Sequence, residues 1–262
     1  ESVFKMAHII IKSAEQIEGI RQSSILAAQT LKYIAEYVVE GVSTAALDKK
    51  IDTYIRDHGA LPAPLNYNGF PKSSCISLNE VVCHGIPNPK EILKNGDILN
   101  VDVTTILNGY FGDTSRMFAI GDIDENAKKL IKIAQDCLDI GIEQCYPENF
   151  VGNIGYEIAK YARANKCSVV YEYCGHGVGV AFHEPPEIAH IAEKDSGAKM
   201  KAGMTFTIEP MINLGKARTK LDKKDGWTVR TIDNKLSAQF EHTLVVTEKG
   251  CEVLTDLDDY YA

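Results

Sequence analysis

The chain has 262 residues, of which 45% are hydrophobic and 24% charged, a composition typical of a globular protein with one large domain or two fused halves. Its formal net charge of −8 argues against nucleic acid or an anionic membrane as the main partner. No apolar run reaches the roughly 18 residues that a membrane span needs.

Cysteine usage indicates the compartment. None of the seven cysteines forms a Cys-x-x-Cys pair, and the sequence has no Asn-x-Ser/Thr sequon. The apolar patch at Ile9–Ile11 is too short for a secretory signal peptide, and because the first residue is Glu1 we expect the given sequence to be trimmed. Reduced thiols and a cytoplasmic location are therefore expected.

Two helices are predicted first along the chain. Ser13 and Gln16 form a capping box, and apolar residues then recur at helical spacing until Gly41 ends the helix. Ser43 or Thr44 caps a second helix, which ends at Gly59. Strand-like segments follow at residues 75–83 and 98–120.

The second part of the chain repeats this order. Apolar spacing predicts helices around Ala127–Leu138 and Val151–Ala162. Strands are predicted at residues 168–171, 205–208, 227–232 and 239–246. We therefore expect a single domain over residues 1–262, with two related halves, roughly 12–121 and 122–253, that share one sheet.

A predicted hairpin brings two aspartates together. Asn108-Gly109 between β-rich runs is typical of a two-residue turn. Such a turn places Asp102 opposite Ser115, and Thr104 opposite Asp113. The two aspartates then share a face as diagonal neighbours, about 7–8 Å apart at the backbone. A bridging metal would relieve their repulsion, whereas the alternative is a pair of solvated strand residues.

Three further residues complete an oxygen-rich ligand set. His176 lies between glycines that let the backbone approach other groups, although a core histidine is the alternative interpretation. Glu209 and Glu241 lie in apolar strand-like runs, where a carboxylate needs a partner. Two aspartates, two glutamates and one histidine would balance two divalent cations, with Mn, Fe, Co or Zn favoured over a thiolate site.

Several motifs together resemble the methionine aminopeptidases of type I, in their short bacterial form. The resemblance covers about residues 12–253. The motifs are Asn66-Tyr-Asn-Gly-Phe-Pro-Lys-Ser-Ser-Cys75, Asn79-Glu-Val-Val-Cys-His-Gly-Ile-Pro87, Asp97-Ile-Leu-Asn-Val-Asp102, Gly112-Asp-Thr-Ser-Arg116, Gly175-His-Gly-Val-Gly179, Glu209-Pro-Met211 and Leu236-Ser-Ala-Gln-Phe-Glu-His242.

The resemblance implies an α+β pita-bread fold of the creatinase/aminopeptidase type, with two pseudo-twofold-related α/β halves around a central antiparallel sheet. It implies a single catalytic domain that removes the N-terminal methionine from nascent proteins and prefers a small second residue. A monomer is expected, and a contact with the ribosome is left open. The same five metal ligands follow from it, namely Asp102, Asp113, His176, Glu209 and Glu241.

The family mechanism implies that a hydroxide bridging two metals attacks the first peptide carbonyl. Glu209 would act as general base and acid, His183 would stabilise the oxyanion, and His84 would contact the scissile nitrogen. A turn-stabilising role for His84 and a cap on the following proline-rich turn for His183 are the alternatives.

The resemblance also implies an apolar methionine pocket. Its candidates are Tyr67, Phe70, Cys75, Phe182 and Trp227, together with His84 and His183 at the reacting end; the aromatic residues could equally be core. Pro64 stands where many relatives carry a cysteine.

Two other functions remain open. Prolidases and aminopeptidase P share the fold and the ligand set, but usually carry a sizeable extra N-terminal domain, whereas here a short segment precedes the first helix. A non-catalytic binding protein that has lost its metals is the second alternative.

Overall fold

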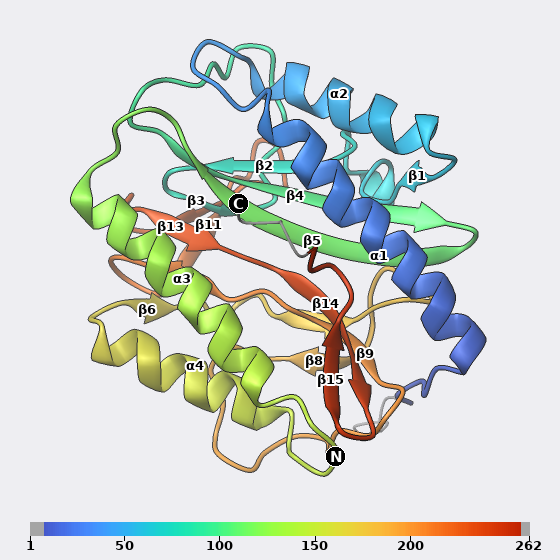
Figure 1. Cartoon of the computed structure of the whole chain (residues 1–262). Coiled ribbons are helices and arrows are strands. Elements are labelled where there is room, and N and C mark those ends of the chain that lie inside the picture. The colour runs from blue at the N-terminus through green and yellow to red at the C-terminus, as the bar shows by residue number, and fades with distance from the viewer. Residues whose placement is uncertain (1–7, 258–262) are drawn as a thin grey trace.

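The computed structural model describes residues 8–257, which form two helix pairs packed on antiparallel strands (Figure 1). The upper pair in that view is α1 (Ala14–Ala35) and α2 (Thr44–Asp57), and the lower pair is α3 (Glu125–Glu143) and α4 (Gly152–Ala164). The predicted order of two helices followed by strands, repeated once, is confirmed.

Local sequence signals explain how the first two helices begin. The Ser13 hydroxyl accepts from the Gln16 N–H and the Gln16 side chain accepts from the Ser13 N–H, so the capping box is present. Ser43 caps α2 by accepting from the Ala46 N–H. The first helix ends at Ala35 rather than just before Gly41, because the chain enters a turn there.

The first sheet is built on a long hairpin. Strands β4 (Ile98–Leu107) and β5 (Tyr110–Ala119) pair in unbroken register around the Asn108-Gly109 turn, whose two residues have φ values of 50° and 83°. On its other edge β4 pairs with β1 (Leu61–Pro62) and β2 (Cys75–Leu78), which completes a four-stranded sheet.

The second sheet has five strands in the order β15-β14-β9-β7-β8. The strands are β7 (Gly175–Gly177), β8 (Glu184–Ile188), β9 (Thr205–Ile208), β14 (His242–Thr247) and β15 (Gly250–Val253). It joins the first sheet where Ser115 of β5 pairs with Glu241. The predicted common sheet is therefore a set of antiparallel ladders joined at this pair.

Short strands complete the structure. They are β3 (Val81–Cys83), β6 (Ser168–Val169), β10 (Met211–Asn213), β11 (Thr219–Leu221), β12 (Val229–Thr231) and β13 (Ser237–Gln239), with a 3-10 turn at Tyr67–Gly69. The strand predicted over residues 239–246 is interrupted before β14, and the segment 75–83 divides into β2 and β3.

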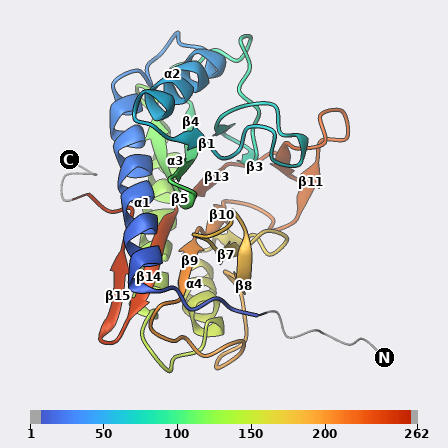
Figure 2. The ribbon, with the colours of Figure 1, turned by 90° about the vertical axis from the view of Figure 1, so that its right-hand side faces the viewer.

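Hydrophobic packing assigns opposite roles to the two faces of the hairpin. Leu99, Val101 and Val103 of β4 pack with α1 and α2 in one core cluster, while α3 and α4 pack on β9 and β14 in another. Because side chains alternate along a strand, Asp102 points away from those helices. Figure 2 shows α1 on one side of the sheets and β3, β8 and β11 on the other.

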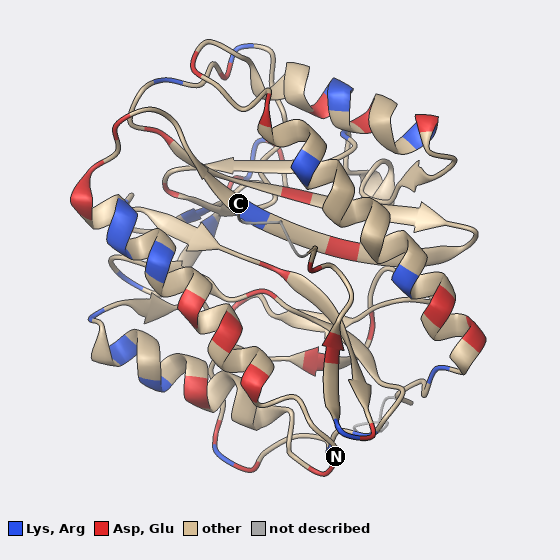
Figure 3. Ribbon diagram, in the orientation of Figure 1, with Lys and Arg blue, Asp and Glu red and all other residues tan. Residues whose placement is uncertain are grey.

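The described residues hold no helix that is long and apolar enough to cross a membrane. All seven cysteines lie among them and are free, as expected for reduced thiols. Figure 3 shows most charged residues on the outer surfaces of the helices and loops, with acidic positions also inside the central strands β4 and β5.

Candidate metal centre

The hairpin delivers two carboxylates to the face that the helices leave free. Asp102 is opposite Ser115 and Thr104 is opposite Asp113, which is the predicted register without a bulge. The Thr104 hydroxyl donates to Asp113 Oδ1 over 2.8 Å and so fixes the orientation of that carboxylate.

The second sheet contributes the imidazole and a glutamate. His176 in β7 places Nε2 at 3.4 Å from both Asp113 Oδ2 and Glu209 Oε2. Its Nδ1 lies 2.8 Å from the Gly177 carbonyl oxygen, which can only accept, so Nδ1 carries the proton. Nε2 therefore faces the carboxylates, which is the orientation of a metal-ligating histidine whose other nitrogen is held by the backbone.

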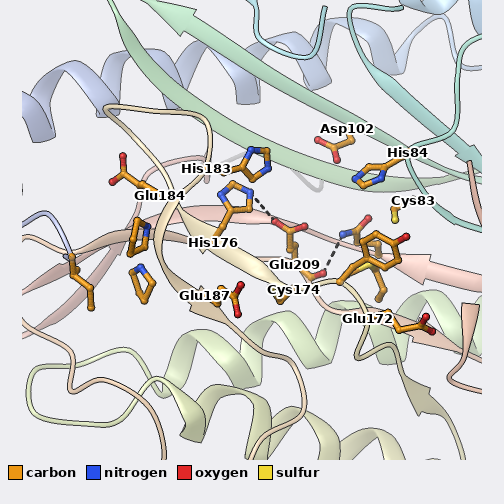
Figure 4. A pocket seen from close by; sticks show the side chains of 16 residues that line it. Cys83, His84, Asp102, Glu172, Cys174, His176, His183, Glu184, Glu187 and Glu209 are labelled. Atoms are coloured by element: carbon orange, nitrogen blue, oxygen red, sulfur yellow. Dashed lines mark hydrogen bonds and ion pairs between the residues drawn. The ribbon is translucent and has the colours of Figure 1, made fainter. Parts of the chain in front are cut away.

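Four of the predicted ligands converge. One ligand atom each from Asp113, His176, Glu209 and Glu241 lies within 4.8 Å of all the others. Asp102 is outside that group of four, but its carboxylate contacts Asp113 and faces the same space. Figure 4 shows Asp102 and His84 across the cavity from His176 and Glu209.

Burial and mutual repulsion perturb the pKa of groups in this cluster. Burial first, and then the charges of Asp113 and Glu209, raise the pKa of both Asp102 and Glu241 well above the usual range. Burial lowers the pKa of His176, but its hydrogen bond to Asp113 and the nearby carboxylate charges outweigh this and raise the pKa to about 9.

Divalent cations fit this donor set. Both carboxylate oxygens of Glu241 are buried, and neither meets a hydrogen-bond donor among residues 8–257. A buried carboxylate without donors is costly unless a cation coordinates it. Carboxylate oxygens with one imidazole nitrogen suit Mn, Fe, Co or Zn, and the described thiols Cys75 and Cys83 stay outside the cluster of four.

Two cavities meet at the cluster. The smaller, of about 150 Å³, is walled by Pro64, Tyr67, Phe70, Cys75, Phe182 and Trp227, and reaches the carboxylates. The larger, of about 860 Å³, runs outward past Tyr173, Glu187 and Met211. Both are lined by His84, Asp102, His176, His183 and Glu209, so three of the five candidate ligands border both cavities, while Asp113 and Glu241 line the smaller one.

His84 and His183 both line this junction. The backbone of His84 has a φ of 56°, a left-handed conformation that is costly for a non-glycine residue. His183 Nδ1 lies 2.9 Å from the Tyr67 hydroxyl. Burial lowers the pKa of both histidines, that of His183 to about 4, so both rings are neutral near pH 7.

The two prolines after His183 lie in an edge strand. The alternative interpretation, in which His183 caps a proline-rich turn, expected a turn at this place. Glu184–Ile188 is β8, the outermost strand of the five. Proline is compatible with an edge strand because no neighbouring strand requires an N–H donor on the outer side of such a strand. Lys12 forms a buried ion pair with Glu184, whose carboxylate also accepts from the Val180 and Ala181 N–H groups.

The sequence analysis missed the residues that support the ligands. Thr207 donates to Glu209 Oε2 over 2.7 Å, and the amide of Gln239 and the ring of His190 hydrogen-bond to the Glu209 backbone. Gln239 lies inside the motif Leu236–His242, whereas His190 has no local signal in the sequence.

Comparisons with known proteins show the family of the chain. The model of metallopeptidase family M24 matches residues 18–248. The methionine aminopeptidase of Rickettsia prowazekii is 51% identical over 247 residues, 94% of this chain and 95% of that protein. The methionine aminopeptidase of Escherichia coli strain K12 is 49% identical over 248 residues, 94% of each.

Solved structures give the same relationship. The crystal structure of the Rickettsia prowazekii methionine aminopeptidase has a TM-score of 0.94 at 49% identity, covering 95% of this chain and 100% of that one. A prolidase from Pyrococcus furiosus, at 22% identity and a TM-score of 0.73, covers 95% of this chain and 66% of that one and shares the fold alone. The expected α+β pita-bread fold is confirmed.

Proposed function

The chain belongs to metallopeptidase family M24 and, within it, to the methionine aminopeptidases, and from this membership we propose that it hydrolyses the first peptide bond of polypeptides that begin with methionine. The observation that carries the proposal is the buried group of carboxylates and one imidazole at the junction of two cavities. The smaller cavity is walled by Tyr67, Phe70, Phe182 and Trp227, and the larger one is proposed to take the rest of the polypeptide.

Two divalent cations are the proposed cofactors, Co, Mn, Fe or Zn. Asp102, Asp113, His176, Glu209 and Glu241 would hold them. When bound, the cations supply Lewis acidity toward the peptide carbonyl and activate water as the nucleophile.

The protein groups at the junction then have distinct tasks. Glu209 borders both cavities and takes the proton from the attacking water, then delivers it to the leaving amine. His183 Nδ1 lies 2.9 Å from the Tyr67 hydroxyl. With that hydroxyl as the donor, the ring proton of His183 is on Nε2, which can donate to the oxyanion. His84 borders both cavities and is assigned the contact with the scissile nitrogen.

The smaller cavity is the proposed methionine pocket. Phe70 is 3% exposed, and its ring meets Trp227 edge-on with centroids 5.2 Å apart. The rings of Tyr67 and Phe182 lie 4.7 Å apart, so aromatic walls close two sides around an unbranched apolar side chain. A small second residue would leave the junction with the larger cavity unobstructed, which is the proposed basis of that preference.

The remaining assignments are also proposals. The chain acts as one catalytic domain over residues 1–262, as a cytoplasmic monomer, on nascent proteins, and a ribosome contact is compatible with that role. Neither nucleic acid nor a membrane is proposed as a partner, in line with the net charge of −8.

The test is turnover of Met-Ala-Ser and of X-Pro peptides by protein supplied with Mn²⁺ or Co²⁺ and by protein treated with a chelator. We expect release of methionine from Met-Ala-Ser only with metal, and none by Glu209→Gln. Turnover by the chelated protein would refute the metal mechanism. Cleavage of X-Pro peptides in preference to Met-Ala-Ser would assign the chain to the proline-specific activity instead.

A further inference from the structure

Glu209 lies at a break in the sheet. Strand β9 ends at Ile208 and β10 begins at Met211, while Pro210 between them has no N–H to donate. The chain changes partner here, because Ile208 pairs with His242 of β14 and Met211 pairs with Gln239 of β13. No strand ladder therefore fixes the backbone of Glu209.

Two buried side chains take the place of the ladder. The Glu209 N–H donates to His190 Nε2 over 3.0 Å, and the Gln239 amide donates to the Glu209 carbonyl oxygen over 3.1 Å. By contrast, the backbone of Glu241 is bonded to the backbone of Ser115 in both directions. Glu209 is thus positioned by side chains, and Glu241 by the fold itself.

His190 shows a feature that core packing alone does not explain. It is 1% exposed, and it must keep Nε2 unprotonated to accept, so its proton is on Nδ1. That Nδ1 is buried and has no hydrogen-bond partner within residues 8–257. An apolar ring such as that of phenylalanine would fill the same space without burying an N–H that lacks an acceptor. The histidine is therefore favoured at this position by the hydrogen bond that it accepts from the Glu209 N–H.

We propose that His190 and Gln239 are positioning residues, which hold the backbone of Glu209 so that its carboxylate meets His176 and Asp113 at the metal centre. This rests on the proposed function. Each of them bonds to the backbone of Glu209 and acts through that residue. The consequence expected of such a partner is a loss of about 10- to 100-fold in metal affinity or in activity.

The test compares His190→Phe, which removes the acceptor, with His190→Gln, whose amide oxygen can accept at a similar reach. The full-length chain is freed of metal and titrated with Mn²⁺ by calorimetry, and kcat and KM for Met-Ala-Ser are measured on the loaded protein. We expect the Phe variant to lose affinity for at least one Mn²⁺ about 10- to 100-fold and to lose kcat more than it changes KM. The Gln variant should recover most of both.

Two further variants separate positioning from general destabilisation. Ile158→Val trims the buried core under α4 and should lower the midpoint of unfolding while leaving Mn²⁺ affinity unchanged. Gln239→Met removes the other bond and should reproduce the loss of affinity, which provides the test should His190→Phe fail to fold.

The outcomes are distinguishable. Wild-type Mn²⁺ affinity in both His190→Phe and Gln239→Met would overturn the inference, as would an equal loss in Ile158→Val. Absence of Mn²⁺ binding by the wild-type chain would instead overturn the proposed function.

Discussion

Replacing Glu241 by glutamine should have opposite effects on the metal-free and the metal-loaded protein. Glu241 is 1% exposed, and its ligand oxygen lies within 4.8 Å of those of Asp113 and Glu209. At that separation each ionised neighbour costs roughly 3 kcal/mol at an effective dielectric constant of about 20. Burial and these charges raise the pKa of Glu241 well above its usual range, so protonation already relieves part of that cost.

We therefore expect metal-free Glu241→Gln to be more stable than metal-free wild type by about 1–3 kcal/mol, because the amide is neutral and can donate to the neighbouring carboxylates. With Mn²⁺ the order should reverse. Wild type gains about 2.7 kcal/mol at a metal concentration 100 times the dissociation constant, whereas the variant has lost a ligand and gains less.

The assay is urea unfolding of both proteins in chelator and in Mn²⁺, followed by circular dichroism. The reasoning would be refuted if Glu241→Gln were the less stable protein in chelator. It would also be refuted if Mn²⁺ stabilised both proteins equally, since Glu241 would then not be a ligand.

Three further results are expected. His84→Ala should lower kcat by about 10²-fold with the metals still bound, because the residue acts on the substrate; metal loss would show a wrong assignment. Trp227→Ala should raise KM for Met-Ala-Ser at unchanged metal content, because it removes the wall against Phe70; an unchanged KM would place methionine elsewhere. Tyr161→Phe should cost about 0.5–1 kcal/mol in urea unfolding near pH 8, since the Tyr161 hydroxyl donates to Asp136 over 2.7 Å at a partly exposed site. That bond raises the pKa of Tyr161 to about 12, so its contribution is complete below pH 10 and declines as pH rises toward 12; a gap between wild type and variant that grows over this range would contradict the assignment.

The hairpin is the part of the site that the sequence predicted in detail. Asn108-Gly109 fixes the turn, and an unbroken register then fixes which face carries Asp102 and Asp113. Both steps depend on neighbours in the chain, so local reasoning was sufficient.

The break around Glu241 could not be predicted in the same way. The run from Gln239 to Val246 reads as one strand, yet the structure divides it into β13 and β14. The interruption arises because Glu241 pairs with Ser115 of the other sheet, a contact between residues far apart in the sequence. Periodicity along one segment carries no information about such a partner.

His190 was missed for a related reason. A lone histidine two residues beyond an edge strand matches no motif, and its importance depends on which N–H it accepts from. Its ligand neighbour Glu209 was found both from the motif that carries the family resemblance and because a carboxylate in an apolar run needs a partner. A residue that acts through another residue can be recognised only from its contacts in the three-dimensional structure.

The central claim is that five side chains from both halves of the chain converge on two cations. Its most direct test is a crystal grown with Mn²⁺ and measured for anomalous scattering. The account predicts two peaks roughly 3.5–4 Å apart between Asp102, Asp113, His176, Glu209 and Glu241. A map with no peak among these residues, or with a single peak that leaves Asp102 uncoordinated, would contradict it.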